Sequence, residues 1–210
     1  MAPRFIARQL SHPAGWFNGV IRFLMNRHNS RMNAFAVKMV EPAPSDRVLE
    51  IGFGGGLNLP SLIGRAGFVA GIDRSHDVVA WARRRFSGAV SGGRAEFGTG
   101  TVEALPFGAD AFDKVCTVNT VYFWTSLDAG FAEIYRVLKS GGRAVIGFLP
   151  KQHMDRMGYP VDIFTTRAAH DVITALERVG FTDIGVERPA PETLWNVIVA
   201  TKPACRPAIA

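Results

Sequence analysis

A short apolar run that stops at a cluster of glycines narrows the choice of folds more than any other feature of this sequence. Residues 48–51 are mostly apolar, Gly52, Gly54 and Gly56 follow at every second position, and a leucine-rich helical pattern comes next. Glycines at these positions let the backbone turn tightly and leave a ligand's approach free of side chains. The following helix would point its free N–H groups and positive dipole end at the same turn. This order predicts a strand, a ligand-binding bend and a helix.

Strand and helix patterns continue to alternate along the chain. Strands are predicted at 48–51, 68–72, 95–97, 112–118, 144–149, 181–186 and 194–200. Helices are predicted at 57–63, 75–86, 127–139 and 168–179, and a loop that could serve as a lid at 150–160. The third of these helices is expected to end at a cap formed by Gly141 and Gly142. The alternation predicts an α/β fold whose mostly parallel sheet is covered on both faces, with ligands at the carboxyl ends of its strands.

The N-terminal part of the chain is expected to be helical and to belong to the same domain. A length of 210 residues suits one domain with a full core. Apolar residues between Pro13 and Met39 recur at helical spacing and are interrupted by a polar cluster at 26–30, which predicts two helices. We therefore expect a helical cap or lid over 1–45, a ligand-binding domain over 46–202 and a short tail over 203–210.

The N-terminal residues do not resemble a signal peptide, and the cysteines form no motif. Arg4 and Arg8 interrupt what would be the apolar stretch of a signal peptide, and no apolar run approaches the roughly 20 residues of a membrane span. The sequence therefore predicts a cytoplasmic protein. Cys116 and Cys205 match no redox or metal-ligand spacing and are expected to be reduced thiols. No cluster of His, Asp or Glu indicates a metal site.

The net charge of +6 is concentrated near the N-terminus. Residues 1–47 carry seven Arg and Lys against two acids, whereas residues 48–210 carry seventeen against sixteen. A basic N-terminal segment is compatible with an anionic partner, such as a lipid surface, RNA or a charged substrate. A solvated helix face explains the same charges equally well.

An acid at the end of the second predicted strand indicates the kind of ligand. Asp73 could accept hydrogen bonds from both ribose hydroxyls of an adenosine-containing molecule, or it could cap the next helix. Nicotinamide dehydrogenases share this fold, but their fingerprint would need a glycine at 57 or 59, where leucines stand. A dehydrogenase is the rival interpretation because it shares the fold, but its glycine fingerprint is not matched here.

A third segment, residues 100–107 followed by 112–115, completes a recognisable set of motifs. With the glycine bend and Asp73 it resembles the class I S-adenosylmethionine-dependent methyltransferases, and among them the group of the ubiquinone and menaquinone C-methyltransferases. The resemblance covers about residues 46–150. It implies a single Rossmann-like, doubly wound α/β domain with N-terminal helices, whose mostly parallel sheet of seven strands includes an antiparallel C-terminal strand. It also implies S-adenosyl-L-methionine as cofactor, S-adenosyl-L-homocysteine as product and no metal.

The resemblance also implies which residues hold the cofactor. The corresponding positions are Glu50, Gly52, Phe53, Gly54, Gly56, Asp73, Arg74, Thr101, Val102 and Asn119. The glycines and Asn119 would face the methionine part, and Glu50 would orient its ammonium group. Asp73 would hold the ribose and Arg74 would lie beside the adenine. Thr101 and Val102 would read the adenine edge, although the family often has an acid where Thr101 stands.

Acceptor residues must come from outside these motifs. Candidates for contact with the acceptor are Trp16, Tyr122, Trp124 and Met154, although Tyr122 and its aromatic neighbours could equally be ordinary packing. The catalytic residues are unknown. His28, Tyr122 and His153 are candidates for a base, and transfer to nitrogen or sulfur needs no dedicated base.

The function expected from the whole sequence is methyl transfer to a small, apolar or aromatic metabolite. Alternative substrates are a phospholipid headgroup, with peripheral lipid contact through residues 1–40, and RNA, for which no recognised binding module is present. An alternative of another class is a catalytically silent cofactor-binding partner protein. The acceptor atom, the need for a base, the oligomeric state and the effect of Thr101 do not follow from the sequence.

Overall fold

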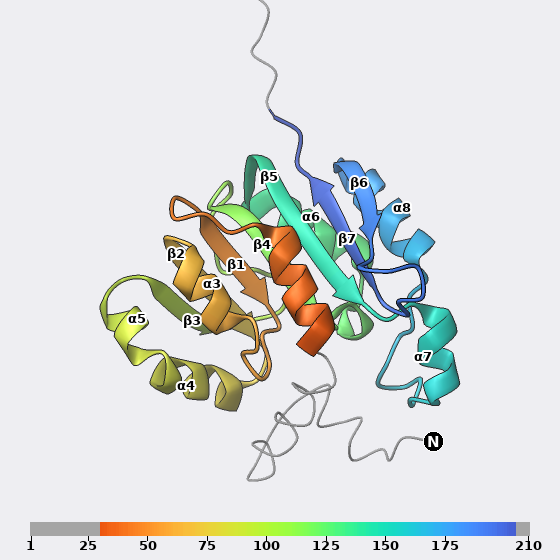
Figure 1. Ribbon diagram of the computed structural model, residues 1–210, viewed down its shortest axis with the longest axis horizontal. Coiled ribbons are helices and arrows are strands. Elements are labelled where there is room, and N and C mark those ends of the chain that lie inside the picture. Colours follow the sequence, from red (N-terminus) through yellow and green to blue (C-terminus); the bar gives the residue numbers. More distant parts are fainter. Residues whose placement is uncertain (1–29, 205–210) are drawn as a thin grey trace, which may run out of the picture.

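The computed structural model describes residues 30–204, and its centre is one sheet of seven strands (Figure 1). The spatial order is β3-β2-β1-β4-β5-β7-β6. Strands β1 to β4 and their neighbour β5 pair in parallel, whereas β7 is antiparallel to both β5 and β6. The strands are β1 (Arg47–Ile51), β2 (Phe68–Asp73), β3 (Ala95–Thr99), β4 (Phe112–Val118), β5 (Leu138–Phe148), β6 (Thr182–Glu187) and β7 (Asn196–Thr201). The predicted doubly wound, mostly parallel sheet with an antiparallel C-terminal strand is confirmed.

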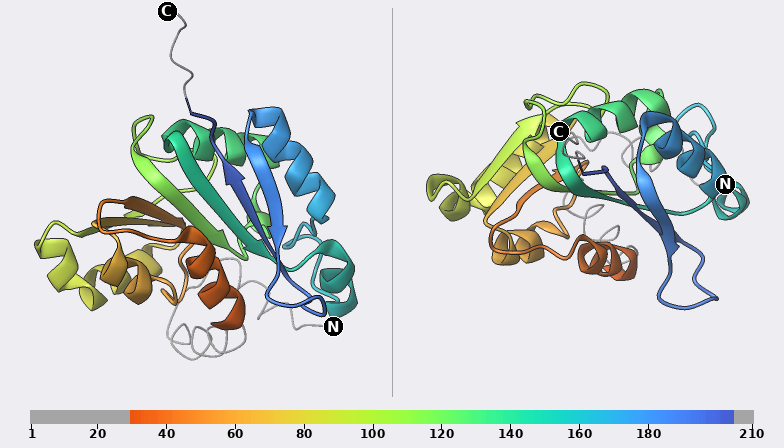
Figure 2. Two further views of the ribbon diagram at one scale, coloured as in Figure 1. Left: turned by 45° about the horizontal axis from the view of Figure 1, so that its top comes forward. Right: turned by 90° about the horizontal axis from the view of Figure 1, so that it is seen from above.

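Helices cover both faces of this sheet (Figure 2). They are α3 (Leu59–Arg65), α4 (His76–Arg85), α5 (Ser87–Ser91), α6 (Leu127–Val137), α7 (Lys151–Met157) and α8 (Ala169–Val179), with a 3₁₀ turn η1 (Val121–Phe123). Residues 30–40 are also helical. The segment 30–40, α3 and α4 pack on one face of the sheet, and α6 and α8 pack on the other. Predicted positions Trp16 and His28 lie outside the described residues.

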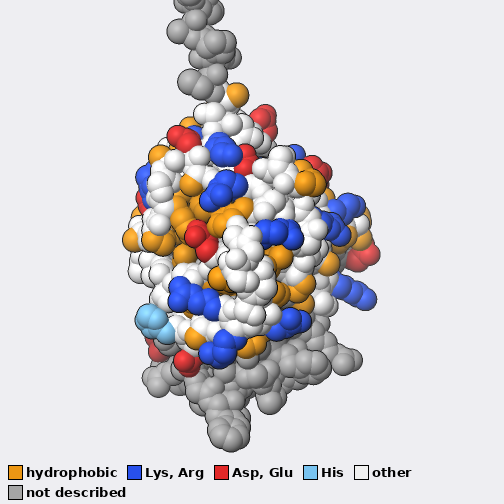
Figure 3. Space-filling view, turned by 90° about the vertical axis from the view of Figure 1, so that its left-hand side faces the viewer, with side chains coloured by type: hydrophobic (Ala, Val, Ile, Leu, Met, Phe, Trp, Pro, Cys, Tyr) orange, Lys and Arg blue, Asp and Glu red, His pale blue; other side chains and the backbone are white. Residues whose placement is uncertain are grey.

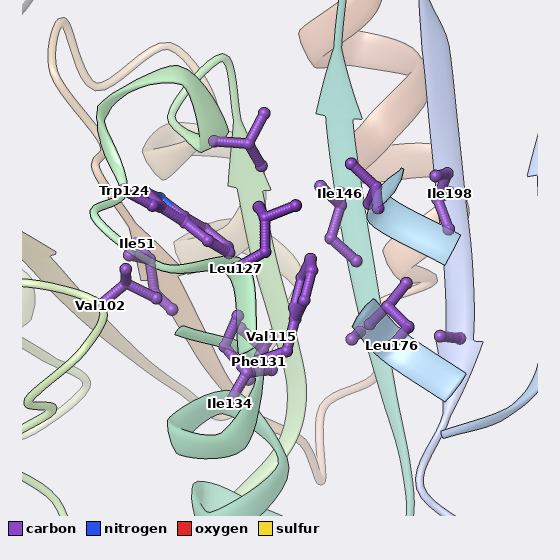
Figure 4. Close-up of a cluster of buried hydrophobic side chains, with 14 of the residues drawn as sticks. Ile51, Val102, Val115, Trp124, Leu127, Phe131, Ile134, Ile146, Leu176 and Ile198 are labelled. Atoms are coloured by element: carbon purple, nitrogen blue, oxygen red, sulfur yellow. The ribbon is translucent and has the colours of Figure 1, made fainter. Parts of the chain in front are cut away.

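Alternation along the strands explains why the core has two halves. Val48 faces the helices α3 and α4, whereas its neighbour Leu49 faces α6. Figure 4 shows the second half, where Val115 and Ile146 of the sheet lie against Phe131 of α6. Phe131 is fully buried, and burial of such a side chain contributes about 1.5–3 kcal/mol. Helices therefore bury the sheet from both sides.

The glycine pair at 141–142 does not cap a helix as the sequence predicts. Helix α6 ends at Val137, and Leu138 is already extended and pairs with Phe112 of β4. Gly141 adopts φ +78° inside β5, where its N–H donates to the carbonyl of Lys202 over 2.8 Å. The pair makes an irregularity in the strand, because the chain enters the sheet without an intervening loop.

The segment 150–160 is not the continuous loop that the sequence predicts. Residues 151–157 form α7, which ends at Gly158 with φ +63°. Its apolar anchor is Met154, which is buried in the α6-side core. One buried residue in a seven-residue helix leaves too little periodicity for the pattern to be recognised. The short helix α5 was not predicted either, and it buries no side chain.

The described part of the chain shows two features that concern membranes and metals. Over residues 30–204, no helix is both long and apolar enough to cross a membrane. The same residues contain no group of three or more His, Cys, Asp or Glu side chains that could hold a metal ion. The thiol of Cys116, in β4, is free and buried.

Candidate functional site

The backbone bend between β1 and α3 is built from glycines that could not be replaced without strain. Gly52, Gly54 and Gly56 have φ angles of +68°, +47° and +68°, which side-chain-bearing residues rarely adopt. The N–H of Gly52 donates to the carbonyl of Ile72 over 2.6 Å, so the bend leaves β1 alongside the end of β2. A Cβ on Gly52 would collide with the side chain of Thr120. The predicted bare-backbone bend is therefore present at the carboxyl edge of the sheet.

Asp73 joins this bend to the end of β2. Its Oδ2 accepts a hydrogen bond from the N–H of Gly54 and its Oδ1 accepts one from the N–H of Ser75, each over 2.9 Å. The cap of helix α4 is Ser75, whose hydroxyl accepts from the N–H of Val78, so Asp73 is not the helix cap. Each carboxylate oxygen can accept a further hydrogen bond. Asp73 is thus a fixed acceptor at the ligand edge.

Glu50 and Asn58 form a second polar pair beneath the bend. The Nδ2 group of Asn58 donates to Oε1 of Glu50 over 2.8 Å, and both side chains are buried. Oε2 of Glu50 is buried without a hydrogen-bond partner. Burial raises the pKa of Glu50 to about 8; the hydrogen bond from Asn58 opposes this rise, and the charge of Asp73 adds to it. Asn58 is a site residue that the sequence reasoning missed.

Arg74 reaches from the end of β2 toward the turn after β4. Its guanidinium carbon lies 5.2 Å from the ring centre of Phe123, a cation–π distance. Burial lowers the pKa of Arg74 despite the opposing attraction of Asp73 and Glu103. The structure therefore brings together side chains from the ends of β2 and β4, which the sequence places 49 positions apart.

Asn119 and Tyr122 connect the ends of β4 and β5. Asn119 has φ +58°, and its N–H donates to the carbonyl of Gly147 over 2.8 Å. The hydroxyl of Tyr122 accepts from the N–H of Leu149 over 2.5 Å and lies 3.2 Å from both Oδ1 of Asn119 and the carbonyl of Leu149. Burial raises the pKa of Tyr122, so loss of its proton is unfavourable. This geometry favours a positioning role over that of a base.

Aromatic side chains gather beside Tyr122. Phe164 lies 4.8 Å from Phe123, 6.1 Å from Tyr122 and 4.7 Å from Tyr159, measured between ring centres. Trp124 instead packs 5.1 Å from Phe131 in the core. Phe164 was not among the predicted site residues, because this residue lies in an irregular segment between α7 and α8 that has no periodic pattern.

The remaining predicted positions lie at the margins of this arrangement. Val102 is buried and lies against the position of Gly130, while Thr101 is exposed and forms an isolated bridge with Ala104. His153 is partly exposed on α7, where its ring contacts the side chain of Gln152 at 3.3 Å. Met154 of the same helix is buried in the core.

Comparisons with known proteins give this arrangement a family. Residues 49–146 match a family model described as a methyltransferase domain. The chain is similar to the uncharacterized methyltransferase YdaC of Bacillus subtilis, with 29% identity over 167 residues that cover 79% of this chain and 87% of YdaC. It is also similar to the ubiquinone/menaquinone biosynthesis C-methyltransferase UbiE of Geotalea daltonii, with 31% identity over 134 residues. That match covers 62% of this chain and 56% of UbiE.

A solved structure shares the fold. It is a SAM-dependent methyltransferase of Thermotoga maritima, described as a possible histamine N-methyltransferase, with a TM-score of 0.68 and 22% identity over 86% of this chain and 92% of that one. The family model begins within β1 and ends within β5, so it covers the bend, Asp73 and the turn after β4. The resemblance found in the sequence, including its direction toward the quinone C-methyltransferases, is confirmed. Residues 49–146 therefore match a methyltransferase domain, in a chain whose fold and sequence are similar to those of class I, Rossmann-like S-adenosylmethionine-dependent methyltransferases.

Proposed function

We propose that this methyltransferase binds S-adenosyl-L-methionine across the bend at 52–56 and transfers its methyl group to a small, apolar or aromatic metabolite. The observation that carries the proposal is the carboxylate of Asp73, which two backbone N–H groups fix beside a bend made of glycines and the buried Phe53. Such a carboxylate suits a ribose, because its two oxygens are acceptors that match the two neighbouring hydroxyl donors of the sugar.

Other residues at the carboxyl edge of the sheet suit the methionine and adenine parts of S-adenosyl-L-methionine. The unpartnered Oε2 of Glu50 is an acceptor suited to an ammonium group, and the glycine backbone of the bend would face the methionine part. Arg74 lies where it could flank the adenine, and the backbone of Thr101 and Val102 would meet the adenine edge. The exposed Thr101 hydroxyl would replace the acid that is common in the family, with a weaker contact to the adenine amino group.

The cofactor supplies an already activated methyl group on its sulfonium. The chain's own residues then have to align the acceptor behind that methyl and keep water away. Tyr122 holds the turn after β4 against the end of β5, and thereby fixes the aromatic side chains of Phe123 and Phe164 beside the site. No general base is assigned, because the hydroxyl of Tyr122 is engaged and His153 lies on the separate helix α7.

The acceptor is proposed to be apolar or aromatic because aromatic rings line the β4–β5 side of the site. Stacking and apolar contact against Phe123, Phe164 and Tyr159 would favour a ring or an apolar chain over a strongly polar molecule. The similarity to UbiE supports a quinone-like acceptor. An RNA substrate finds less support: Figure 3 shows Lys and Arg dispersed over one face, and Arg83 of the arginine run donates to the carbonyl of Phe97.

The test combines binding with product detection. Isothermal titration calorimetry should show binding of S-adenosyl-L-methionine and S-adenosyl-L-homocysteine, and no heat with NAD. Incubation of a metabolite extract with methyl-labelled cofactor should then transfer label to an apolar or aromatic compound. Binding without any labelled product across metabolites, vesicles and RNA would instead indicate the silent partner protein. Absence of cofactor binding would refute the proposal.

A further inference from the structure

Glu50 and Asn58 bracket the bend and form a deeply buried polar contact at its base. Glu50 is 4% exposed and Asn58 is 2% exposed. Their hydrogen bond of 2.8 Å joins the end of β1 to the residue that precedes α3. This hydrogen bond therefore links the residues on either side of the bend, which consists of residues 52–56.

The surroundings of Glu50 explain why one of its oxygens has no partner. In the sheet, Glu50 pairs with Gly71 of β2 and with Cys116 of β4. Gly71 has no side chain, and the thiol of Cys116 is buried and has a raised pKa, because burial and the proximity of Glu50 disfavour the thiolate. Neither neighbour can neutralise a carboxylate. Asn58 supplies a single neutral hydrogen bond, which leaves Oε2 unsatisfied.

An ionised carboxylate in this position would be costly in the empty site. A buried charge with one hydrogen bond and no counterion loses far more hydration than it regains. Among the described residues, the titratable groups that interact with Glu50 are the acid Asp73 and the thiol of Cys116, and neither is a cation. The protein without cofactor therefore holds Glu50 as a neutral carboxylic acid at pH 7, in agreement with its raised pKa.

We propose that binding of the cofactor's ammonium group expels the proton of Glu50, and that Asn58 is the positioning residue that holds the resulting carboxylate toward the ligand. This inference rests on the proposed function. The balance is simple: the neutral acid and the ammonium ligand give a carboxylate–ammonium pair, and one proton passes to the buffer. Cofactor affinity of this protein is then coupled to pH through a residue that touches no part of the reacting methyl.

Calorimetry in buffers of different ionisation enthalpy measures this proton directly. At pH 6.5 the free α-amino group of the cofactor is still mostly protonated, since such groups have pKa values of about 7.7–8.0. The proton count therefore reports on the protein. We expect about one proton released per cofactor bound, and an affinity that rises by close to tenfold per pH unit between about pH 5.5 and 7.

Three variants test whether this proton comes from Glu50. Glu50→Gln removes the titrating group, and it should bind the cofactor more weakly, with no proton release and no dependence of affinity on pH in this range. Glu96→Gln removes an exposed carboxylate from β3 and should release the same proton as the wild type. Asn58→Ala removes the hydrogen bond that favours the charged form, so the ionisation of Glu50 should move to higher pH.

Carbon-13 NMR of protein labelled at the glutamate side-chain carboxyl gives a second, independent measurement. The Glu50 signal, assigned by its loss in Glu50→Gln, should report a neutral acid in the free wild type at pH 6.5 and a carboxylate in the complex. If Glu50→Gln does not fold, the proton count and the pH profile of the wild type decide alone. Cofactor binding without proton release, or an ionised Glu50 in the free protein, would overturn this inference and leave the methyltransferase assignment intact. Absence of cofactor binding refutes both.

Discussion

Replacement of Gly56 by alanine tests whether the bend depends on its left-handed backbone. Gly56 has φ +68°, and a Cβ there would lie 2.8 Å from the indole ring of Trp81. Gly64, in the exposed part of helix α3, is the matched control, because a Cβ there meets nothing within 4 Å and its φ is helical. The same chemical change is therefore made eight residues apart in opposite environments.

The expected effects have opposite signs. A side-chain-bearing residue in the left-handed region costs about 1–2 kcal/mol. The contact with Trp81 adds about 1–3 kcal/mol, the usual cost of an extra carbon in a filled space. Gly64→Ala should instead stabilise the protein by about 0.5–1 kcal/mol, because alanine suits a helix better than glycine. The two variants should thus differ by at least about 2.5 kcal/mol in free energy of unfolding.

Equilibrium unfolding in urea, followed by circular dichroism, measures this difference. For a protein of this size it corresponds to at least about 5 °C in Tm. The combined variant Gly56→Ala/Trp81→Ala, set against Trp81→Ala alone, removes the contact and leaves only the backbone strain of about 1–2 kcal/mol. A Gly56→Ala protein as stable as Gly64→Ala would show that the bend tolerates a side chain. The φ angle of +68° at Gly56 would then not require glycine.

Three further predictions concern the polar residues of the site. Asp73→Asn turns one acceptor into a donor beside the N–H of Gly54 or Ser75, so cofactor affinity in calorimetry should fall at least about tenfold; unchanged affinity would contradict the ribose role. Tyr122→Phe leaves the N–H of Leu149 unpaired and should lower the free energy of unfolding by about 1–3 kcal/mol in urea titrations, whereas equal stability would show that the hydroxyl contributes nothing. Because the pKa of Glu50 is raised from 4.5 to about 8, the folded cofactor-free protein keeps a proton that the unfolded chain has lost. Its stability relative to Glu50→Gln should therefore fall as pH rises through this window; a difference independent of pH would refute the shift.

The strands could be predicted from the sequence because buried parallel strands are nearly continuous apolar runs. Residues 144–149 illustrate this, since Val145 and Ile146 are both buried although they face opposite sides of the sheet. The start of β5 at Leu138 could not be predicted in this way. Residues 139–143 are polar or glycine, and they enter the sheet through pairing with β4 and contacts with Lys202, which no local pattern records.

The same distinction between local patterns and long-range contacts applies to the residues of the site. The bend and Asp73 were found because motif and spacing are local, and the structure adds that the N–H of Gly54 binds Asp73 directly. Asn58 was missed because its role depends on Glu50, eight residues earlier, being buried beneath the bend. Phe164 was missed because its neighbours Tyr122 and Phe123 come from another part of the chain.

The topology explains why these residues meet at one place. The sheet order puts β1 between β2 and β4, so the chain leaves β1 toward one side of the sheet and leaves β4 toward the other. At such a switch point, the connections after the two strands separate and expose the strand ends to a ligand. The same arrangement buries Glu50 in β1, between two neighbouring strands that offer no counterion at this position. A fold that opens a ligand site at the end of β1 thus also creates, beneath that site, a carboxyl group for which a cationic ligand is the natural partner.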